Sequence, residues 1–474
     1  MIRFPARRHR LRLPSALAAA AACGLAFAQP QAVPPVAGAV AVPAPAPAVS
    51  PSAQRLYERA RGQLVQVRTL LKGQDSQASV GSGFYVSNDG LIVTNYHVVS
   101  QVALQPERYR LVYTRVDGRE GQLQLLGFDA VHDLALVKAL AATGGRGAAP
   151  AANGDDVPAR PVDVPGAPLA FRPGSEPLSQ GERLYSLGNP LDVGFAVLEG
   201  TYNGTVERSF YPSIFFAGAL NAGMSGGPAL DEQGRVMGVN VATRRDGQQV
   251  SFLVPAAFAE ALVERARGAP PITAPVYPQL TGQLMAHQEA VVARFLKQPW
   301  RSAGHPHYRI PVPQEEFMRC WGRSTPADTK GLEFERSDCE MDTQIFVSES
   351  LATGSLSVRH EAYDGRKLGT LRFTERYSQS FRNESFGRRN TREYTAPQCR
   401  ERYVEEGSLP LRAVLCLTAY KRLTGLYDLS VLVATLDEGA LGAQGRLDAR
   451  GVSFDNAMKL AGHYLRGYGL KELP

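Results

Sequence analysis

Hydrophobic residues in the first half of the chain occur in short runs that glycine and other turn residues separate. Many short apolar runs at close spacing predict β-strands arranged as a sandwich or as barrels. A helix is expected on either side of this region, at about residues 53–64 and 255–267. The expected strands are residues 65–71, 83–86, 90–94, 109–114, 121–128, 134–138, 183–187, 200–208, 235–242 and 250–254.

The second half of the chain mixes two patterns. Residues 284–297 carry apolar residues at helical spacing, and Ser453 is placed to cap a last helix that runs to about residue 468. Between these helices apolar and polar residues alternate, which predicts antiparallel strands with one solvated face. The expected strands are residues 343–347, 354–359, 368–377, 391–394, 411–418 and 426–434. An α+β domain is therefore expected here.

The length of 474 residues exceeds what one hydrophobic core usually absorbs, so two folded domains are expected. Residues 29–53 are rich in proline, alanine and valine, which is typical of an extended tether. Segments 143–159 and 161–177 read as surface loops. The expected division is a signal peptide at 1–28, a linker at 29–53, a first domain at 54–268, a linker at 269–280 and a second domain at 281–474.

The first 28 residues have the features of a secretory signal. Five arginines precede a short alanine-rich apolar stretch, and Ala26-Phe27-Ala28 is a small-x-small site that predicts cleavage after Ala28. The stretch is too short to span a bilayer stably, and lipid attachment at Cys23 is a weaker alternative. We therefore expect a periplasmic or secreted protein.

Charge gives no reason to expect a nucleic-acid partner. The chain has 52 lysines and arginines, of which the signal carries five, so 47 remain against 45 acidic residues. A nearly neutral mature chain lacks the basic surface that binds phosphate backbones. Protein or peptide partners are the expectation that remains.

Four cysteines remain once the signal is removed, and an even number in an oxidising compartment predicts two disulfides. Sequence alone leaves three pairings open. We favour Cys320–Cys339 and Cys399–Cys416, because neighbouring strands bring nearby cysteines together; free buried thiols are the alternative. No Cys-x-x-Cys motif or cysteine–histidine cluster is present, so neither a metal site nor a cofactor is expected.

Gly223-Met224-Ser225-Gly226-Gly227-Pro228 is the strongest local signal for chemistry. A serine hydroxyl needs an adjacent base and a place for negative charge to develop. Glycine at 223 allows a tight turn whose Gly223 and Ser225 amides would form an oxyanion hole. The alternative is a glycine-rich hairpin with an incidental serine.

A base and an acid must come from elsewhere in the chain. His97 lies in Thr94-Asn95-Tyr96-His97-Val98-Val99, which is expected to end a strand, so that its ring faces a cleft. Asp133 precedes the apolar run 134–138, where its carboxylate would be partly desolvated and could orient the imidazole. A structural histidine and a turn-capping aspartate are the alternatives. His132 is a weaker candidate for the base.

Together these segments resemble the trypsin-like peptidases, most closely the HtrA/DegP branch of bacterial periplasmic proteases. The resemblance implies two perpendicular six-stranded β-barrels, with His97 as base, Asp133 as its orienting acid and Ser225 as nucleophile in the cleft between them. It implies acyl transfer to Ser225 from a peptide substrate. The matching segments are 81–84, 94–99, 133–138, 187–190, 223–228 and 251–255.

Two departures narrow what the resemblance implies. Met224 stands where digestive relatives have aspartate and the HtrA branch usually has asparagine, so activation by a new amino terminus is not expected. Ala219 stands at the pocket base, where aspartate would select arginine or lysine. A preference for small or medium aliphatic P1 residues is therefore expected. The expected pocket residues are Ala219, Leu220, Val239, Asn240 and Val241.

The second half shows no glycine-flanked carboxylate-binding loop of a PDZ domain, so PDZ-dependent regulation is not carried over. Trp300, Trp321 and the aromatic and basic stretch 373–394 are a candidate contact face for an envelope or partner protein. Ordinary packing with a solvated basic face is the simpler interpretation of these residues. A catalytically silent protease-fold scaffold is the alternative to an active enzyme.

Overall fold

The computed structural model describes residues 49–140, 162–243, 250–326, 328–381, 390–406, 409–436 and 439–471. The expected signal peptide at 1–28, Cys23, most of the linker at 29–53 and the insertion at 143–159 lie outside these ranges.

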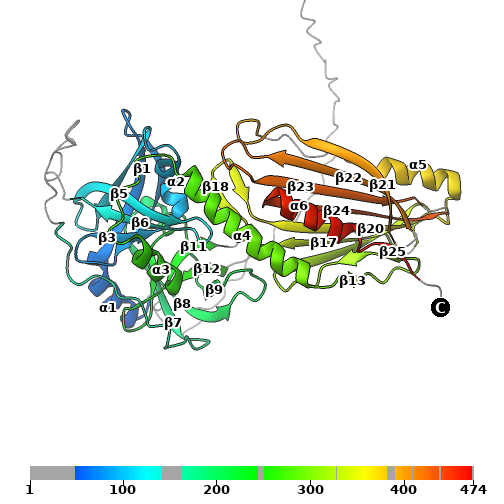
Figure 1. The fold of residues 1–474 in the computed structure, drawn as a ribbon. Coiled ribbons are helices and arrows are strands. Elements are labelled where there is room, and N and C mark those ends of the chain that lie inside the picture. Colours follow the sequence, from blue (N-terminus) through cyan, green and yellow to red (C-terminus); the bar gives the residue numbers. More distant parts are fainter. Residues whose placement is uncertain are drawn as a thin grey trace, which may run out of the picture. The chain divides into compact units, whose positions relative to one another are not determined.

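The first six strands form a closed antiparallel barrel in the described part of the chain, in the order β1-β2-β3-β6-β5-β4 (Figure 1). Branched and aromatic side chains of alternate strand positions fill its interior, among them Val65, Val67 and Ile92. The strands are β1 (Leu64–Leu71), β2 (Gln77–Tyr85), β3 (Leu91–Thr94), β4 (Tyr109–Arg115), β5 (Glu120–Asp129) and β6 (Leu134–Ala139).

The next six described strands close a second antiparallel barrel, in the order β10-β11-β12-β9-β8-β7. This confirms the predicted pair of six-stranded barrels. Short strands β9 and β10 were not expected from the sequence, because runs of three or four residues give no readable period. The strands are β7 (Arg183–Gly188), β8 (Ala196–Thr205), β9 (Ile214–Ala217), β10 (Pro228–Leu230), β11 (Val236–Thr243) and β12 (Val250–Pro255).

Two helices pack against a core that draws on both barrels. Helix α1 (Pro51–Ala60) buries Leu56, and α3 (Ala256–Ala266) buries Leu262, beside Leu136 of the first barrel and Val239 of the second. The Ser50 hydroxyl caps α1 by accepting a hydrogen bond from the Ala53 amide at 3.2 Å. The helix expected at 53–64 thus begins earlier, and a short 3₁₀ turn (Arg61–Gln63) separates it from β1.

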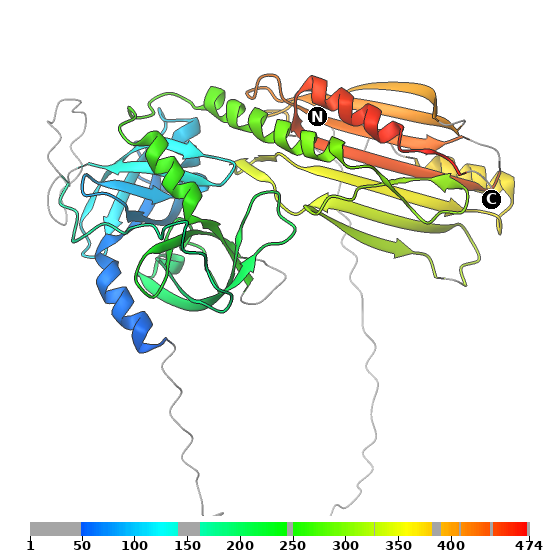
Figure 2. The ribbon, with the colours of Figure 1, turned by 60° about the horizontal axis from the view of Figure 1, so that its bottom comes forward.

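The second half is built on a seven-stranded antiparallel sheet in the described chain, in the order β16-β17-β20-β24-β23-β22-β21. Helices α4 (Tyr277–Lys297) and α6 (Phe454–Leu465) cover one face of it (Figure 2). The sheet strands are β16 (Met318–Ser324), β17 (Glu333–Met341), β20 (Leu356–Asp364), β21 (Gln398–Glu406), β22 (Leu409–Ala419), β23 (Tyr427–Thr435) and β24 (Leu441–Val452). Smaller pieces are β13 (Arg301–Ser302), β14 (Tyr308–Arg309), β15 (Pro311–Val312), β18 (Ile345–Ser348), β19 (Leu351–Thr353), α5 (Thr370–Ser380) and β25 (Gly469–Leu470).

Several element predictions in this half need correction. Residues 368–377, expected as a strand, are largely helix α5, because Phe373 and Tyr377 meet at helical i,i+4 spacing with ring centroids 5.3 Å apart. Residues 391–393 form a turn rather than a strand, and Tyr394 makes an isolated antiparallel bridge to Tyr420. Helix α4 begins at Tyr277, inside the expected linker, whereas the helix capped by Ser453 is confirmed. Within the described residues no helix is long and apolar enough to cross a membrane.

One hydrophobic core joins the second half to the first barrel. Leu280 and Leu284 of α4 and Val347 of β18 are buried together with Val99 of helix α2 (Tyr96–Leu104), which packs on that barrel. Residues 49–474 accordingly form a single compact unit. The domain boundaries expected at residues 268 and 281 stay a prediction.

Disulfides hold the two outermost strands of the seven-stranded sheet. Cys320–Cys339 joins edge strand β16 to β17, and Cys399–Cys416 joins edge strand β21 to β22. The favoured pairing is therefore confirmed. Each bond lies between directly opposed residues, so each edge strand is covalently tied to its only neighbour in the sheet.

Replacing Cys320 and Cys339 together by alanine should lower the unfolding free energy by about 3 kcal/mol, because the bond closes a loop with a sequence separation of 19 residues. Urea unfolding, followed by circular dichroism, measures this change. Ser324→Ala on the same edge strand is the control and should change the free energy by less than about 0.5 kcal/mol. Equal stability of the double variant and the wild type would contradict the structural role of the bond.

Candidate active site

His97 lies in the first turn of helix α2 and not at a strand end, which corrects the expectation from sequence. Strand β3 ends at Thr94, and Asn95 is the N-cap residue of the helix. The β-branched pair Val98-Val99 suggested a strand, but Val98, Val99 and Val102 are all buried against the first barrel, and this packing outweighs their strand propensity.

Asp133 accepts hydrogen bonds from the first backbone amides of helix α2. Its backbone carbonyl accepts hydrogen bonds from the Tyr96 amide at 3.2 Å and from Asn95 Nδ2 at 2.7 Å. Its carboxylate Oδ1 accepts a bond from the His97 amide at 2.8 Å. The first amides of a helix have no partner within the helix, so Asp133 caps α2 from a distant segment. It does so with φ of 55°, a conformation that aspartate tolerates better than most residues.

The same carboxylate holds the imidazole, since Asp133 Oδ2 lies 2.6 Å from His97 Nδ1. Burial lowers the pKa of His97, but the charge and the hydrogen bond of Asp133 outweigh it and raise the pKa above 6.5. An Nδ1–H that donates to the carboxylate leaves Nε2 of the neutral ring with a free lone pair. The dyad is thus suited to accept a proton at Nε2.

The turn that carries Ser225 is clamped by Ser82 of β2. The Ser82 amide donates to the Ser225 carbonyl at 2.7 Å, and its hydroxyl donates to the Gly223 carbonyl at 2.7 Å. The same hydroxyl accepts from the Asn189 amide at 2.9 Å. Gly223 has φ of 91°, which favours glycine. Ser82 is a positioning residue that the sequence reasoning did not identify, although it lies in the Gly-Ser-Gly-Phe segment.

Asn240 clamps the turn from the second barrel. Its buried side chain donates to the carbonyls of Leu187 at 3.0 Å and Met224 at 3.2 Å, and accepts from the Ser186 hydroxyl at 2.8 Å. Its backbone amide also donates to the Gly227 carbonyl at 2.9 Å. The Asn240 side chain, expected in a substrate pocket, thus contacts the backbone that supports Ser225.

The serine turn packs tightly against the junction that carries His97. A Cβ atom on Gly226 would lie 2.4 Å from Thr94 Oγ1 and 2.9 Å from the Asn95 nitrogen. A Cβ on Gly81 would lie 2.5 Å from Val98 and 2.9 Å from the Ser225 carbonyl oxygen. Only glycine fits at these two positions, so the backbone segments of Ser225 and His97 approach closely.

The hydroxyl of Ser225 has a different partner in this structure. Its Oγ donates to the Val241 carbonyl at 3.4 Å, and among the described residues no hydrogen bond joins it to His97. The structure therefore pairs His97 with Asp133 and brings the serine turn beside them, without completing the line of three side chains.

Two backbone amides of the turn are available. Among the described residues, neither the Gly223 nor the Ser225 amide donates a hydrogen bond, whereas Met224 donates to Asn221 at 3.1 Å. Free amides within one turn can stabilise an oxygen that gains negative charge. This arrangement supports the expected oxyanion hole.

The remaining expected pocket residues lie in different surroundings. Leu220 is buried in the core of the second barrel, and Ala219 is exposed. Val239 belongs to the core that both barrels share, and Val241 is half-buried. Their role in substrate selection stays a prediction.

A loop beside the turn presents apolar side chains to solvent. Leu191 and Val193 are 65% and 81% exposed, and the Leu191 amide donates to the Ala222 carbonyl at 2.7 Å. Sequence reasoning noted the preceding Leu-Gly-Asn-Pro segment but not these residues. They border the Gly223 turn on its open side.

A second histidine–aspartate pair lies close by. His132 Nδ1 is 2.9 Å from Asp129 Oδ2, and its ring stacks on Phe258 with centroids 3.7 Å apart. Its Nε2 is buried and has no hydrogen-bond partner among the described residues. The His132 side chain is thus less exposed than that of His97, and the assignment of the base stays a prediction.

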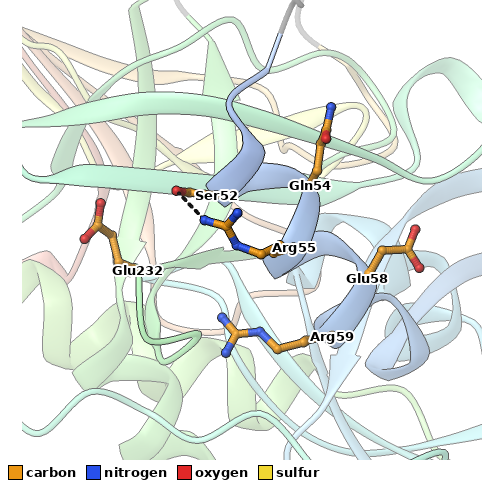
Figure 3. Close-up of a pocket in the computed structure, with 6 residues that line it drawn as sticks. All are labelled: Ser52, Gln54, Arg55, Glu58, Arg59 and Glu232. Carbon is orange, nitrogen blue, oxygen red and sulfur yellow. Dashed lines mark hydrogen bonds between the residues drawn. The ribbon is translucent and has the colours of Figure 1, made fainter.

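Other candidate surfaces lie apart from these residues. A depression of about 630 Å³ lies beside α1, and Figure 3 shows the residues that line it. These residues do not include His97, Asp133 or Ser225. They are Ser52, Gln54, Arg55, Glu58, Arg59 and Glu232. Trp300 stacks on His463, whereas Trp321 on edge strand β16 is 63% exposed. Partner recognition through the second half stays a prediction.

Comparison with known proteins gives matches that begin in the first barrel and end in the second. Residues 81–239 match the family model of the trypsin-like peptidase domain. HhoA of Synechocystis sp., a candidate serine protease by its name, is 32% identical over 193 residues, which are 39% of this chain and 42% of that protein. A protein of Halomonas elongata named "Probable periplasmic serine endoprotease DegP-like" is 31% identical over 188 residues, 38% of this chain and 34% of its own.

The chain spans less than half the length of these curated relatives. The crystal structure of the serine endoprotease from Yersinia pestis aligns with a TM-score of 0.36 and 22% sequence identity, over 46% of this chain and 67% of that one.

Asp133→Asn should lower the pKa of His97, because the carboxylate favours the imidazolium while burial continues to oppose it. NMR titration of the ring measures this shift. In the wild type the folded pKa lies above 6.5, so the pair stabilises the folded chain below pH 6.5, and this contribution is lost as pH rises through the folded pKa.

Asp129→Asn is the matched control for this titration, because it removes the partner of His132 and leaves the His97–Asp133 contact in place. A pKa of His97 that responds equally to both variants would contradict the assigned pair.

Proposed function

We propose that this chain, whose residues 81–239 form a trypsin-like peptidase domain, is an exported serine endopeptidase that hydrolyses peptide bonds through Ser225, His97 and Asp133. The observation that carries the proposal is the His97–Asp133 contact of 2.6 Å beside a clamped turn that bears Ser225. A base oriented by a carboxylate is what a serine nucleophile requires.

Ser225 Oγ attacks the carbonyl carbon of the scissile peptide bond while His97 Nε2 takes the hydroxyl proton. His97 then gives this proton to the leaving amine, and an acyl-enzyme ester on Ser225 remains. Water attacks the ester with His97 again as base, which releases the carboxylic acid and restores the serine. Asp133 keeps its charge throughout and stabilises the imidazolium that forms in each half.

The amides of Gly223 and Ser225 stabilise the tetrahedral oxyanion in both steps. Because they donate no hydrogen bond within the described residues, they need not break one when charge develops. A preorganised donor of this kind is typically worth about 10²–10³-fold in rate.

One observation favours the alternative of a catalytically silent scaffold, namely the bond of Ser225 Oγ to the Val241 carbonyl. Turning the serine side chain is the smallest movement that redirects Oγ, and catalytic hydrogen bonds are often absent before substrate binds. The chain has all three residues of the proposed triad, and the Gly223 and Ser225 amides are free. These features support an active peptidase over a catalytically silent scaffold.

Export rests on the charged and apolar pattern of residues 1–28 and on the two disulfides of the described chain. Disulfides persist in oxidising compartments such as the bacterial periplasm. Two relatives carry names that describe periplasmic endoproteases. Proteins and peptides of the periplasm or the medium are the proposed substrates.

The proposed preference at P1 is for small or medium aliphatic residues. Ala219, at the expected pocket base, carries no charge, and neighbouring Leu220 is buried among apolar side chains. A basic P1 side chain would lose its hydration without gaining a carboxylate partner.

Ser225→Ala should abolish labelling by a fluorophosphonate probe and lower peptide hydrolysis by about 10⁴-fold or more, because the nucleophile is removed. The measurement uses periplasmic extract and medium from cells that produce the full chain, so that the labelled band also reports export. Exposed Ser175→Ala is the control and should label like the wild type. A wild-type chain that never labels would favour the silent scaffold.

A peptide library varied at P1 should give higher kcat/KM for alanine, valine or leucine than for arginine or lysine. Steady-state cleavage rates measure this ratio. A preference for arginine would overturn the proposed pocket while leaving the triad untouched.

A further inference from the structure

A hairpin from the second half reaches the helix that carries His97. Strands β18 and β19 pair antiparallel and connect β17 to β20 of the large sheet. The Tyr96 hydroxyl on α2 donates to the Val347 carbonyl at 3.2 Å, and Gln101 donates to Glu349 at 3.1 Å. The hairpin is therefore docked on α2 by both buried and exposed contacts.

One aromatic side chain of the hairpin, Phe346, lies beside His97. Ile345 and Val347 point into the core that they share with α2. Phe346, between them, packs against the edge of the same core and is only partly buried, at the point where the pairing of β18 with β19 becomes irregular. Its ring lies edge-on to His97, with centroids 6.1 Å apart and planes at 77°, and 6.4 Å from Tyr96.

The position of Phe346 is fixed from the side of the large sheet. Thr353 of β19 and Tyr420 share a buried hydroxyl contact of 2.6 Å. His287 of α4 lies 3.0 Å from the Gly354 carbonyl, directly after β19. The β18–β19 hairpin is packed on α2 and also against the second half of the chain. The placement of the Phe346 ring therefore does not depend on a loop. Phe346 is only half-buried, and its ring contacts that of His97.

We propose that Phe346 forms an apolar wall of the substrate cleft and selects an apolar side chain at one substrate position other than P1. This inference rests on the proposed endopeptidase function. A peptide whose carbonyl is attacked beside His97 must cross the accessible face of that imidazole. A substrate side chain there meets the Phe346 ring, which favours apolar groups and gives a charged group no partner.

The second half of the chain thereby becomes part of the active site. The two barrels supply the nucleophile, base and acid, and the hairpin supplies selectivity at a position that the barrels leave open. Phe346 contacts substrate in this scheme, whereas Tyr96 and Val347 position it.

The test uses the full chain and peptides that are varied at one position at a time outside P1. The wild type should prefer leucine over glycine and lysine at one of these positions. Phe346→Ala should reduce the leucine-to-glycine ratio of kcat/KM about tenfold there, within the range measured for losing an apolar contact. Phe346→Leu should keep most of the ratio. Phe346→Glu should shift the preference toward lysine, because it places a carboxylate at the wall.

Ser350→Ala, on the exposed hairpin turn, is the matched control and should keep the wild-type ratios. Fluorophosphonate labelling shows whether each variant retains its folded triad. If Phe346→Ala does not fold, the kcat/KM ratios of Phe346→Leu and Phe346→Glu test the selectivity role.

Unchanged ratios in all three Phe346 variants, with normal labelling, would overturn the selectivity role alone. An equal fall in kcat for every peptide, with a shifted pH profile, would also overturn it, because that result assigns Phe346 to positioning His97. A wild-type chain that neither labels nor hydrolyses any peptide would remove the proposed function and this inference together.

Discussion

The contact between Asp133 and the start of helix α2 is the constraint on which the site depends. A helix of nine residues leaves its first amides without partners, and Asp133 satisfies the amides of Tyr96 and His97. The oxygen that remains free holds the His97 ring at 2.6 Å. Helix position and imidazole orientation therefore come from one residue. A change that weakens the cap also moves the base, so stability and chemistry cannot be tuned separately here.

The turn that bears Ser225 is supported differently, by buried polar side chains that bind the backbone of this glycine-rich turn. Ser82 of the first barrel and Asn240 of the second hold the same turn from opposite sides. Each barrel thus contributes to the placement of Ser225, although only the second barrel carries it. Because Gly81 and Gly226 have no room for a side chain, the seam between the barrels is set by backbone contacts. Such contacts tolerate little displacement, which suits a site that must align atoms.

The sequence predicted short β-strands in a sandwich or barrels, because strand period and glycine spacing are local properties; its resemblance to the trypsin-like peptidases implied the pair of six-stranded barrels. It did not place His97 in a helix, since a buried helix that is rich in valine reads like a strand until its packing partner is known. It also missed the positioning role of Ser82, because a hydroxyl bonded to a carbonyl 141 residues away leaves no local signal. The sequence reasoning also missed Phe346, because its position beside His97 depends on where the distant β18–β19 hairpin docks. The roles of His97, Ser82 and Phe346 all depend on tertiary contacts that leave no local pattern.

The disulfides at the two edges of the seven-stranded sheet affect how long the folded chain resists proteolysis. Peptidases cut segments that open locally into extended chain, and outermost strands open most readily because only one neighbour holds them. In this protein each of the two edge strands, β16 and β21, is joined to its neighbouring strand by a disulfide. Separating β16 or β21 from the sheet would require breaking a disulfide as well as the hydrogen bonds between the strands. The two disulfides should therefore slow proteolysis at the edges of the sheet, which would otherwise open first.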